Sequence, residues 1–511
     1  MADERTTERA AEVAAGSGLV FAGNLLNRGL RFLTSWVLAN FLGPVGYGVY
    51  EGARNYVTIL ASFAPLGTDK GVVYFGARQR EAGDLEALRG TVLMTWISAL
   101  IGGPLIGGLA ALVVWLALQG NTWAIAVLEP IGALEEGLPR VLLLMLPAVG
   151  VWSLLLAAVG TLRGLKDMRG QTLAYLVVLP IGMLGAAALS IPGLGVEVVA
   201  VGFVAANAVS LAVAIPLVQR RLKPLISGVK PKLAWGRMLA YSLPESFSSM
   251  LFRVNQWADT LMVLAIAGTA ETGLYRTAVT LAMIGEVPAV AVNTMFQPVL
   301  AEMVQADDPK QLSRVLRIVT RWMVILAAPV YLGVYVGIDV LLSLWKAEYA
   351  ASGDALTILL WGQAAYVLTV PVNALIPMSG KAKLNLGNAS VAAMLNIGLN
   401  AWLIPLYGIE GAATATGISL GAWSLWRMVQ VRVLLGQQGF GARAVFLVVS
   451  FVVLALSFRE LSAGYGLLVQ GGATLSSIAL FCAVAWIWGR TPGDSEVLDR
   501  VTTRLKRRFG R

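Results

Sequence analysis

Long apolar segments separated by short polar breaks run through most of the chain. An apolar run of about 18 or more residues is long enough to cross the hydrocarbon core of a bilayer as an α-helix. The pattern therefore predicts an all-α polytopic membrane protein with fourteen transmembrane helices. These helices cover roughly residues 16–42, 47–68, 91–118, 140–160, 171–190, 196–218, 238–267, 272–299, 321–343, 354–377, 386–404, 408–431, 443–458 and 465–489.

The composition supports a membrane protein and argues against several kinds of chemistry. Apolar residues make up 57% of the 511 residues and charged residues only 13%, whereas about a quarter of the residues of a soluble globular protein are charged. The chain has no histidine and one cysteine, Cys482. Zinc sites, iron–sulfur clusters, disulfides and histidine-dependent catalysis are therefore not expected. We expect no cofactor, no metal site and no catalytic residues.

The net charge of +10 comes from basic residues that flank the membrane. Cytoplasmic loops of membrane proteins are enriched in lysine and arginine. If both termini are cytoplasmic, the inside segments contain 30 lysines and arginines, whereas the outside loops contain only Arg140, Lys346 and Arg459. We therefore expect a multi-pass protein of the cell (inner or plasma) membrane with both termini in the cytoplasm and no nucleic-acid partner. The first fifteen residues are polar and do not have the pattern of a cleaved signal peptide.

An internal repeat relates the two halves of the chain. A shift of 225 positions superposes Gly43, Gly48, Tyr50 and Ala53 on Gly268, Gly273, Tyr275 and Ala278, and Arg28 on Arg253. Six helices separate the copies, so both halves have the same orientation, which lets two lobes rock around a central cavity. The predicted parts are a cytoplasmic tail (1–15), an N-lobe of helices one to six (16–218), a cytoplasmic linker (219–237), a C-lobe of helices seven to twelve (238–435), helices thirteen and fourteen (436–489) and a basic cytoplasmic tail (490–511).

Polar residues follow one face of each of the first two helices. They are 3, 1, 3 and 4 residues apart in both, a helical spacing. Burying an arginine in the bilayer costs about 2.5 to 3.5 kcal/mol on insertion scales, so these faces predict a shared water-filled cavity. They consist of Asn24, Asn27, Arg28, Arg31 and Ser35 in the first helix and of Glu51, Arg54, Asn55, Thr58 and Ser62 in the second.

The cavity is expected to be positively charged, because Glu51 is the only acid clearly within the first six helices. A guanidinium group donates two parallel hydrogen bonds to a phosphate, so we expect cargo that bears a phosphate or pyrophosphate. The alternative is that Arg31 and Arg54 form structural ion pairs with Glu51 or extend to the membrane interface, and that Asp259 neutralises Arg253. The candidate substrate-binding residues are Arg28, Arg31, Arg54, Arg253, Asn24, Asn27 and Asn55.

Three acidic residues in the second half are candidates for binding a coupling ion. Glu245, Asp259 and Glu286 lie within the predicted helices seven and eight. A carboxylate inside the membrane is a functional candidate by default, because its charge is costly there. The coupling ion would be a proton or sodium.

Several short segments in helices one to twelve are typical of a known family. They are Arg28 and residues 41–44 (FLGP), 47–50 (YGVY), 162–166 (LRGLK), 377–381 (PMSGK), 396–400 (NIGLN) and 403–413 (LIPLYGIEGAA). The segment at 403–413 is the most specific. Through these segments the chain resembles the polysaccharide transporter family of lipid-linked oligosaccharide flippases, in the superfamily that also contains multidrug and toxin extrusion (MATE) transporters and lipid II flippases.

The resemblance implies a MATE-like V of two pseudo-symmetric six-helix lobes that open alternately to the two sides. Its implied function is to move a polyprenyl-pyrophosphate-linked oligosaccharide, a polysaccharide or O-antigen repeat unit, from the cytoplasmic to the outer leaflet. Implied partners are this glycan lipid, membrane lipids, and glycan polymerases or glycosyltransferases, with the chain itself a monomer. Cavity arginines of such relatives engage the pyrophosphate, and Arg28, Arg31, Arg54 and Arg253 occupy matching places.

Three other functions are alternatives. Drug-extruding relatives carry a cation-coupling carboxylate in the first helix, where this chain has Arg28 and Arg31, so a cation-coupled multidrug exporter is disfavoured. A lipid II-type flippase shares the expected fold. A membrane glycan polymerase or ligase usually needs a large outside loop, but the longest predicted one, 119–139, has about twenty residues. The sequence lacks a Gly-x4-Gly-Lys-Ser/Thr phosphate loop, so we expect neither direct use of ATP nor enzymatic activity.

Overall fold

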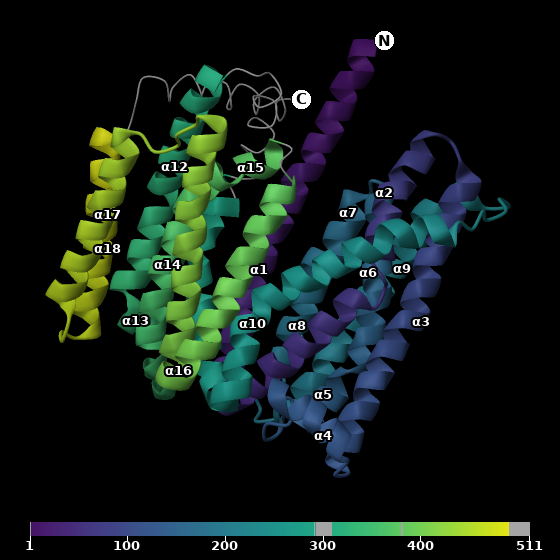
Figure 1. Ribbon diagram of the computed structural model, residues 1–511, viewed down its shortest axis with the longest axis horizontal. Coiled ribbons are helices and arrows are strands. Elements are labelled where there is room, and N and C mark those ends of the chain that lie inside the picture. Colours follow the sequence, from purple (N-terminus) through teal and green to yellow (C-terminus); the bar gives the residue numbers. More distant parts are fainter. Residues whose placement is uncertain (1, 291, 293–308, 380–381, 490–511) are drawn as a thin grey trace. The chain divides into compact units, whose positions relative to one another are not determined.

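The computed structural model describes residues 2–290, 292, 309–379 and 382–489 of the chain. All regular secondary structure in these residues is helical (Figure 1), which confirms the predicted all-α fold. The chain divides into two compact units, residues 1–276 and 277–511, and each is described by itself. The predicted lobe boundary at 219–237 stays a prediction.

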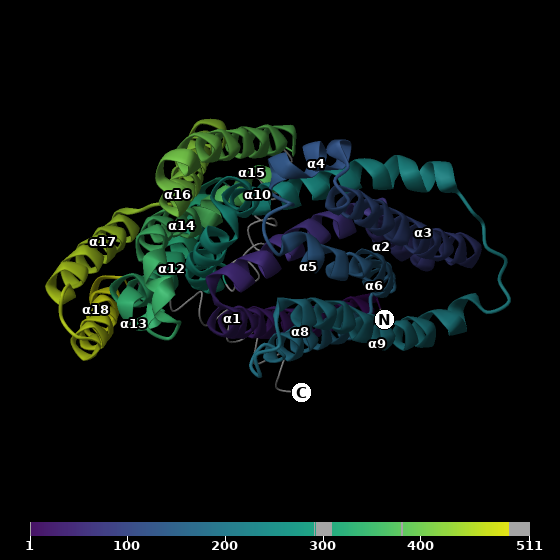
Figure 2. The ribbon, with the colours of Figure 1, turned by 90° about the horizontal axis from the view of Figure 1, so that it is seen from below.

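The first unit is built around α6, which packs against α2, α3 and α9. Its core includes Leu155, Ala158 and Leu162, all fully buried. In Figure 2, α8 and α9 lie side by side in this unit. Its helices are α1 (Ala2–Phe63), α2 (Thr68–Glu81), α3 (Leu85–Leu118), α4 (Thr122–Leu128), η1 (Glu129–Ile131), α5 (Leu138–Met145), α6 (Pro147–Gly164), α7 (Met168–Gln171), the π-helical η2 (Thr172–Val178), α8 (Leu179–Ala188), α9 (Val196–Ile226) and α10 (Trp235–Ala282).

The second unit contains the rest of α10 and a bundle centred on α14 and α16. These two helices approach closely at Gly362 and Gly417, where a Cβ on Gly362 would lie 2.4 Å from the Cα of Gly417. Small residues permit such contacts between membrane helices. Its further helices are η3 (Met283–Glu286), α12 (Pro309–Val336), α13 (Ile338–Leu342), η4 (Ala347–Ser352), α14 (Gly353–Asn373), α15 (Leu375–Met378), α16 (Ala382–Leu435), α17 (Ala442–Ser462) and α18 (Leu467–Trp488).

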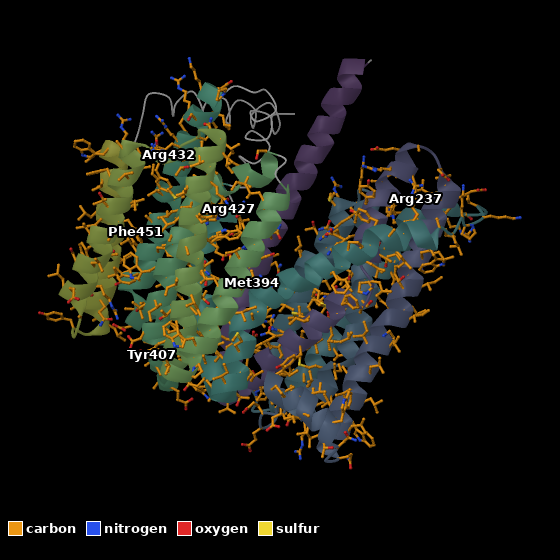
Figure 3. All side chains as sticks on the ribbon, viewed as in Figure 1. Arg237, Met394, Tyr407, Arg427, Arg432 and Phe451 are labelled. Carbon is orange, nitrogen blue, oxygen red and sulfur yellow. The ribbon has the colours of Figure 1, made fainter. Side chains whose placement is uncertain are left out.

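The last two helices form a hairpin within the second unit. Both α17 and α18 pack on α12, and Phe451, labelled in Figure 3, is buried on the packed side of α17. An ion pair of 2.8 Å joins Arg459 of α17 to Asp339 of α13. On α16, in contrast, Met394 and Tyr407 are 65% and 61% exposed (Figure 3). Exposed apolar side chains on a membrane helix are suited to contact with lipid.

Three long helices each contain a glycine that breaks the helix without a loop. The breaks lie at Gly43 (φ 71°), Gly268 (φ 89°) and Gly408 (φ 55°). Positive φ values are costly for residues that carry a Cβ, so glycine suits these positions. The breaks at Gly43 and Gly268 fall between two predicted spans, and the break at Gly408 falls on the first residue of the predicted span 408–431. The helices α1, α10 and α16 therefore each correspond to two transmembrane helices of the predicted set.

In the described residues, nine helices are long and apolar enough to cross a membrane. The chain is thus a multi-pass membrane protein. The number is lower than fourteen for a physical reason. The helix α1 carries both polar faces and α10 carries Arg253, Asp259 and Arg276, so these two helices are less apolar than the other nine, and α16 counts once although Gly408 divides it.

The connections between the predicted spans are more helical than expected. The basic segment 69–90 is mostly α2, and the predicted outside loop 119–139 contains α4 and η1. The chain between α9 and α10 is residues 227–234, shorter than the predicted linker. The end of the predicted eighth helix and the basic tail at 490–511 lie outside the described residues.

Candidate substrate-binding site

The two copies of the glycine motif cross each other within the first unit. A Cβ on Gly48 would lie 1.7 Å from the carbonyl oxygen of Thr269, and one on Gly273 would lie 2.0 Å from the carbonyl oxygen of Pro44. Thr269 and Gly273 are the repeat equivalents of Pro44 and Gly48, so the contacts are reciprocal, as at a local two-fold axis. Glycine at 48 and 273 is what lets the backbones come this close.

The crossing brings Glu51 next to two arginines. Glu51 is 4% exposed, and its Oε2 accepts a hydrogen bond of 2.5 Å from Nη2 of Arg54, one helical turn further along α1. The same oxygen lies 3.2 Å from Nε of Arg276. Arg276 is the repeat equivalent of Glu51, so the ion pair joins matching positions of the two copies.

Trp257 forms cation–π contacts with both of these guanidinium groups. Its ring centroid lies 5.0 Å from Cζ of Arg54 and 4.8 Å from Cζ of Arg276. A cation over an indole face gains about 0.5 to 2 kcal/mol, with the larger values where water is excluded. Trp257 is buried. The carboxylate and the indole together fix the positions of two like charges that would otherwise repel.

Arg31 adds a third cation to this cluster. It lies within electrostatic range of Arg54, Glu51 and Arg276, and it forms neither a hydrogen bond nor an ion pair in the described part of the chain. Arg31 is exposed, whereas Glu51, Arg54 and Arg276 are buried. Three guanidinium groups thus lie near a single carboxylate, which pairs with two of them, and two positive charges remain unneutralised. We call Arg31, Glu51, Arg54, Trp257 and Arg276 the arginine cluster.

Unpaired polar groups lie beside the cluster. Among the described residues, Asn55 is fully buried, and neither its amide nitrogen nor its oxygen has a hydrogen-bond partner. The Thr58 hydroxyl and the Trp257 indole N–H are also buried without partners there. An unsatisfied buried polar group costs about 1 to 3 kcal/mol. These groups therefore favour binding of water or a polar ligand at this place.

The structure brings some predicted site residues together and leaves others apart. Arg31 and Arg54 belong to the cluster, and Asn55 adjoins Arg54 on α1. Asn24, Asn27 and Arg28 are half-buried on the earlier part of α1, and Arg253 is half-buried on α10. The substrate-binding role of all seven residues stays a prediction.

The three ion-coupling candidates have separate surroundings. Glu245 forms an ion pair of 3.8 Å with Lys70. Asp259 accepts hydrogen bonds from the Tyr275 hydroxyl at 2.8 Å and from the backbone N–H of Thr260 at 2.7 Å. Glu286 is half-buried at the end of η3 in the second unit. Their ion-coupling role stays a prediction.

Those contacts bear on the structural alternatives. The expected pair of Arg54 with Glu51 is present. Asp259 makes its side-chain contacts with Tyr275 and Thr260 in the described residues and does not pair with Arg253. Within that part of the chain, His, Cys, Asp and Glu form no group of three that could hold a metal ion.

Sequence reasoning missed Arg276 and Trp257. A signal for Arg276 exists, because the shift of 225 positions places it on Glu51. Trp257 lies four residues after Arg253, on the same face of the predicted seventh helix. From the sequence alone, an aromatic residue there is expected to face lipid, whereas the structure places two cations over its ring.

Comparisons with known proteins agree with this architecture. The chain matches the model of a polysaccharide biosynthesis protein family over residues 13–304 and the MatE model over residues 244–402. No curated protein matches the chain.

Several solved structures share the fold. They include the lipid II flippase MurJ in an inward closed conformation (14% identity, TM-score 0.67, 91% of this chain and 98% of that chain). An inward-facing multidrug resistance MATE family transporter is also similar (17%, 0.62, 80% and 95%), as is a MOP superfamily transporter from Pyrococcus furiosus (15%, 0.52, 82% and 95%). The chain therefore has a MATE/MurJ-like fold. Because the first family match covers more than half of its residues, the chain belongs to the polysaccharide biosynthesis protein family.

Proposed function

We propose that the chain is a flippase that moves a polyprenyl-pyrophosphate-linked oligosaccharide from the cytoplasmic to the outer leaflet by alternating access. The observation that supports the proposal is the arginine cluster, in which three guanidinium groups lie near a single carboxylate. Two uncompensated positive charges inside a membrane protein are costly without an anionic ligand. A pyrophosphate supplies the matching charge.

The geometry of the cluster suits a diphosphate in two ways. Glu51 and Trp257 hold Arg54 and Arg276 in place before any ligand binds, so little side-chain entropy is lost on binding. The Arg31 side chain forms no hydrogen bond or ion pair in the described residues and can offer both edges of its guanidinium to a phosphate.

The glycan and the polyprenyl chain need different surroundings. Asn55 and Thr58 place unpaired polar atoms next to the cluster, where they can hydrogen-bond to sugar hydroxyls or to bridging water. The polyprenyl chain stays in the bilayer throughout, so no free energy is spent on transferring it to water. Alternation between two access states would then carry only the head group across.

A flipping assay with purified full-length protein in liposomes tests this function. The probe is a fluorescent polyprenyl-pyrophosphate disaccharide, and a membrane-impermeant quencher reports which leaflet holds the head group. We expect transfer by the wild type and at least about a tenfold slower transfer for Arg31→Ala, since a hydrogen bond to a charged group contributes about 1.5 to 3 kcal/mol.

Two controls make the test specific. Arg140→Ala removes an exposed arginine of α5 outside the cluster and should leave transfer unchanged. A polyprenyl disaccharide that lacks the diphosphate should not be moved faster than in protein-free liposomes. Equal transfer of both lipids would refute selection by the pyrophosphate.

A cation-coupled multidrug exporter is the second candidate, supported by the MatE match over residues 244–402. The positive charge of the arginine cluster disfavours binding of organic cations. The Pyrococcus furiosus structure is described as having a binding pocket of reverse polarity that suggests a different function, so the fold tolerates pockets of different charge. Uptake of ethidium by inside-out vesicles, abolished by collapsing the sodium or proton gradient, would favour the exporter.

A further inference from the structure

A pocket of ≈ 690 Å³ lies between α3 and α9 in the first unit, away from the helices that form the arginine cluster. One helical face of each helix lines it. Positions 89, 92, 93 and 96 of α3 and positions 215, 218, 219, 222, 223 and 226 of α9 follow the 3-and-4 spacing of such a face. The pocket residues of α9 lie in its C-terminal part. Figure 2 shows this end of α9, from which the chain passes to α10.

The pocket has an apolar wall and a basic rim. Leu93 and Trp96 of α3 and Ile215 of α9 form part of the wall, and Lys223 lies at the rim. A neighbouring pocket of ≈ 500 Å³ shares Lys223 and adds Arg220. None of the residues that line either pocket is acidic.

Hydrogen bonds join the end of α9 and the residues after it to α3, and they fix the two walls of the pocket relative to each other. Arg89 donates hydrogen bonds to the carbonyl oxygens of Ile226, at 3.4 Å, and Val229. The backbone N–H of Lys232 donates to the carbonyl oxygen of Glu86 at 3.0 Å. These bonds hold the basic rim over the apolar wall.

The cations at the rim are not neutralised by the protein. The side chains of Arg220 and Lys223 form no ion pair or hydrogen bond among the described residues. Their neighbour Arg221 points elsewhere and pairs with Asp167 at 2.7 Å. On this turn of α9, therefore, Arg221 has a carboxylate as its ion-pair partner, whereas Arg220 and Lys223, which line the pockets, do not.

We propose that this pocket binds an anionic phospholipid. Its phosphate lies at Lys223 and Arg220, and one acyl chain lies along Trp96, Leu93 and Ile215. The rim belongs to a segment rich in lysine and arginine, which is predicted to be cytoplasmic, so it sits at head-group depth of that leaflet. Leu93 is 39% exposed and gives the acyl chain a way in from the bilayer.

Native mass spectrometry of delipidated full-length protein in detergent tests the site. The probe is phosphatidylglycerol, and phosphatidylcholine of the same acyl chains is the zwitterionic comparison. We expect tighter binding of phosphatidylglycerol, and for Arg220→Gln/Lys223→Gln a loss of about fivefold for each charge removed, equal to about 1 kcal/mol per basic residue.

The matched control is Arg221→Gln, which removes a cation from the same helical turn but not from the pocket. It should bind phosphatidylglycerol as the wild type does, and Trp96→Ala should weaken binding of both lipids. An equal loss in Arg221→Gln and in the double variant would show diffuse surface electrostatics and overturn the proposal. Competition by millimolar glycerol 3-phosphate would do the same, since it would show a site for soluble phosphates.

Discussion

Glu51 and Arg276 occupy equivalent positions in the internal repeat and form an ion pair with each other, with Oε2 and Nε 3.2 Å apart. The pair lies beside the reciprocal glycine contacts at Gly48 and Gly273. If the side chains at these two positions were identical, the local two-fold axis would bring like charges together and they would repel. Opposite charges there make the crossing self-complementary, and Arg54 and Arg31 then add the positive surplus.

Replacing Glu51 by glutamine should destabilise the protein strongly. Loss of one partner of a buried ion pair costs about 3 to 5 kcal/mol, and here it would leave three guanidinium groups without a carboxylate. We expect a clear fall in the melting temperature of the purified protein in detergent and slower head-group transfer. Glu51→Asp keeps the charge and should fall between the two. A Glu51→Gln variant as stable as the wild type would contradict the structural role of this carboxylate.

The repeat relationship makes a charge swap informative. Glu51→Arg alone places a fourth guanidinium in the cluster and should lower the melting temperature strongly. The double variant Glu51→Arg/Arg276→Glu should recover part of the stability, because the two positions are related by the local axis. The coupling energy from the four melting curves should be about 0.5 to 3 kcal/mol. A coupling energy of zero would mean that the pair does not interact in the protein.

Replacing Arg31 by alanine should separate function from stability. Arg31 has no hydrogen bond or ion pair in the described residues, so its removal relieves repulsion and should leave the melting temperature unchanged or slightly higher. Head-group transfer should fall at least about tenfold, from the lost charge-assisted hydrogen bonds. Arg31→Lys should restore transfer only in part, because lysine lacks the planar two-donor edge. Unimpaired transfer in Arg31→Ala would remove this residue from substrate binding.

Arg28 and Arg253 test whether the binding surface extends beyond the arginine cluster. They are repeat equivalents, and both are half-buried. If they also contact the head group, Arg28→Ala and Arg253→Ala should abolish export of surface glycan in cells while the protein still inserts at normal abundance. Immunoblotting of membranes controls for insertion. Normal export by both variants would confine binding to the cluster.

The glycine crossing should tolerate no side chain. Gly48→Ala would place a Cβ 1.7 Å from a carbonyl oxygen, so the backbones of both copies must move apart. We expect a loss of several degrees in melting temperature and reduced transfer. Gly29→Ala on the same helix has no atom within 4 Å of the new Cβ and should raise helix stability by up to about 1 kcal/mol. Equal melting temperatures in the two variants would contradict the close crossing.

Much of the fold follows from local physics and could be predicted from the sequence. A membrane helix satisfies its own backbone hydrogen bonds and must be apolar over its length, so spans are visible as apolar runs. The 225-residue shift likewise aligns Gly43 with Gly268, and both glycines break their helices. The two stripes were visible as well, because residues three and four apart share a helical face.

The partners of the charged residues depended on contacts between distant segments. Sequence spacing could pair Glu51 with Arg54, three residues away, but not with Arg276. Glu245 and Asp259 resembled each other as membrane acids, and only their neighbours, Lys70 and Tyr275, distinguish them. A partner far along the chain is set by how helices cross, and the spacing of residues along one helix does not contain that angle or depth.

By itself, the sequence determined an all-α membrane protein, its repeat, and a polar face with too few acids for its arginines. Those properties depend on hydropathy and helical period, which are local. The tertiary structure decided which arginines share Glu51, that Trp257 lies against two of them, and that one face of α3 and one of α9 enclose a basic pocket. Such contacts join residues up to 225 positions apart, and close packing of specific helix faces is what creates them.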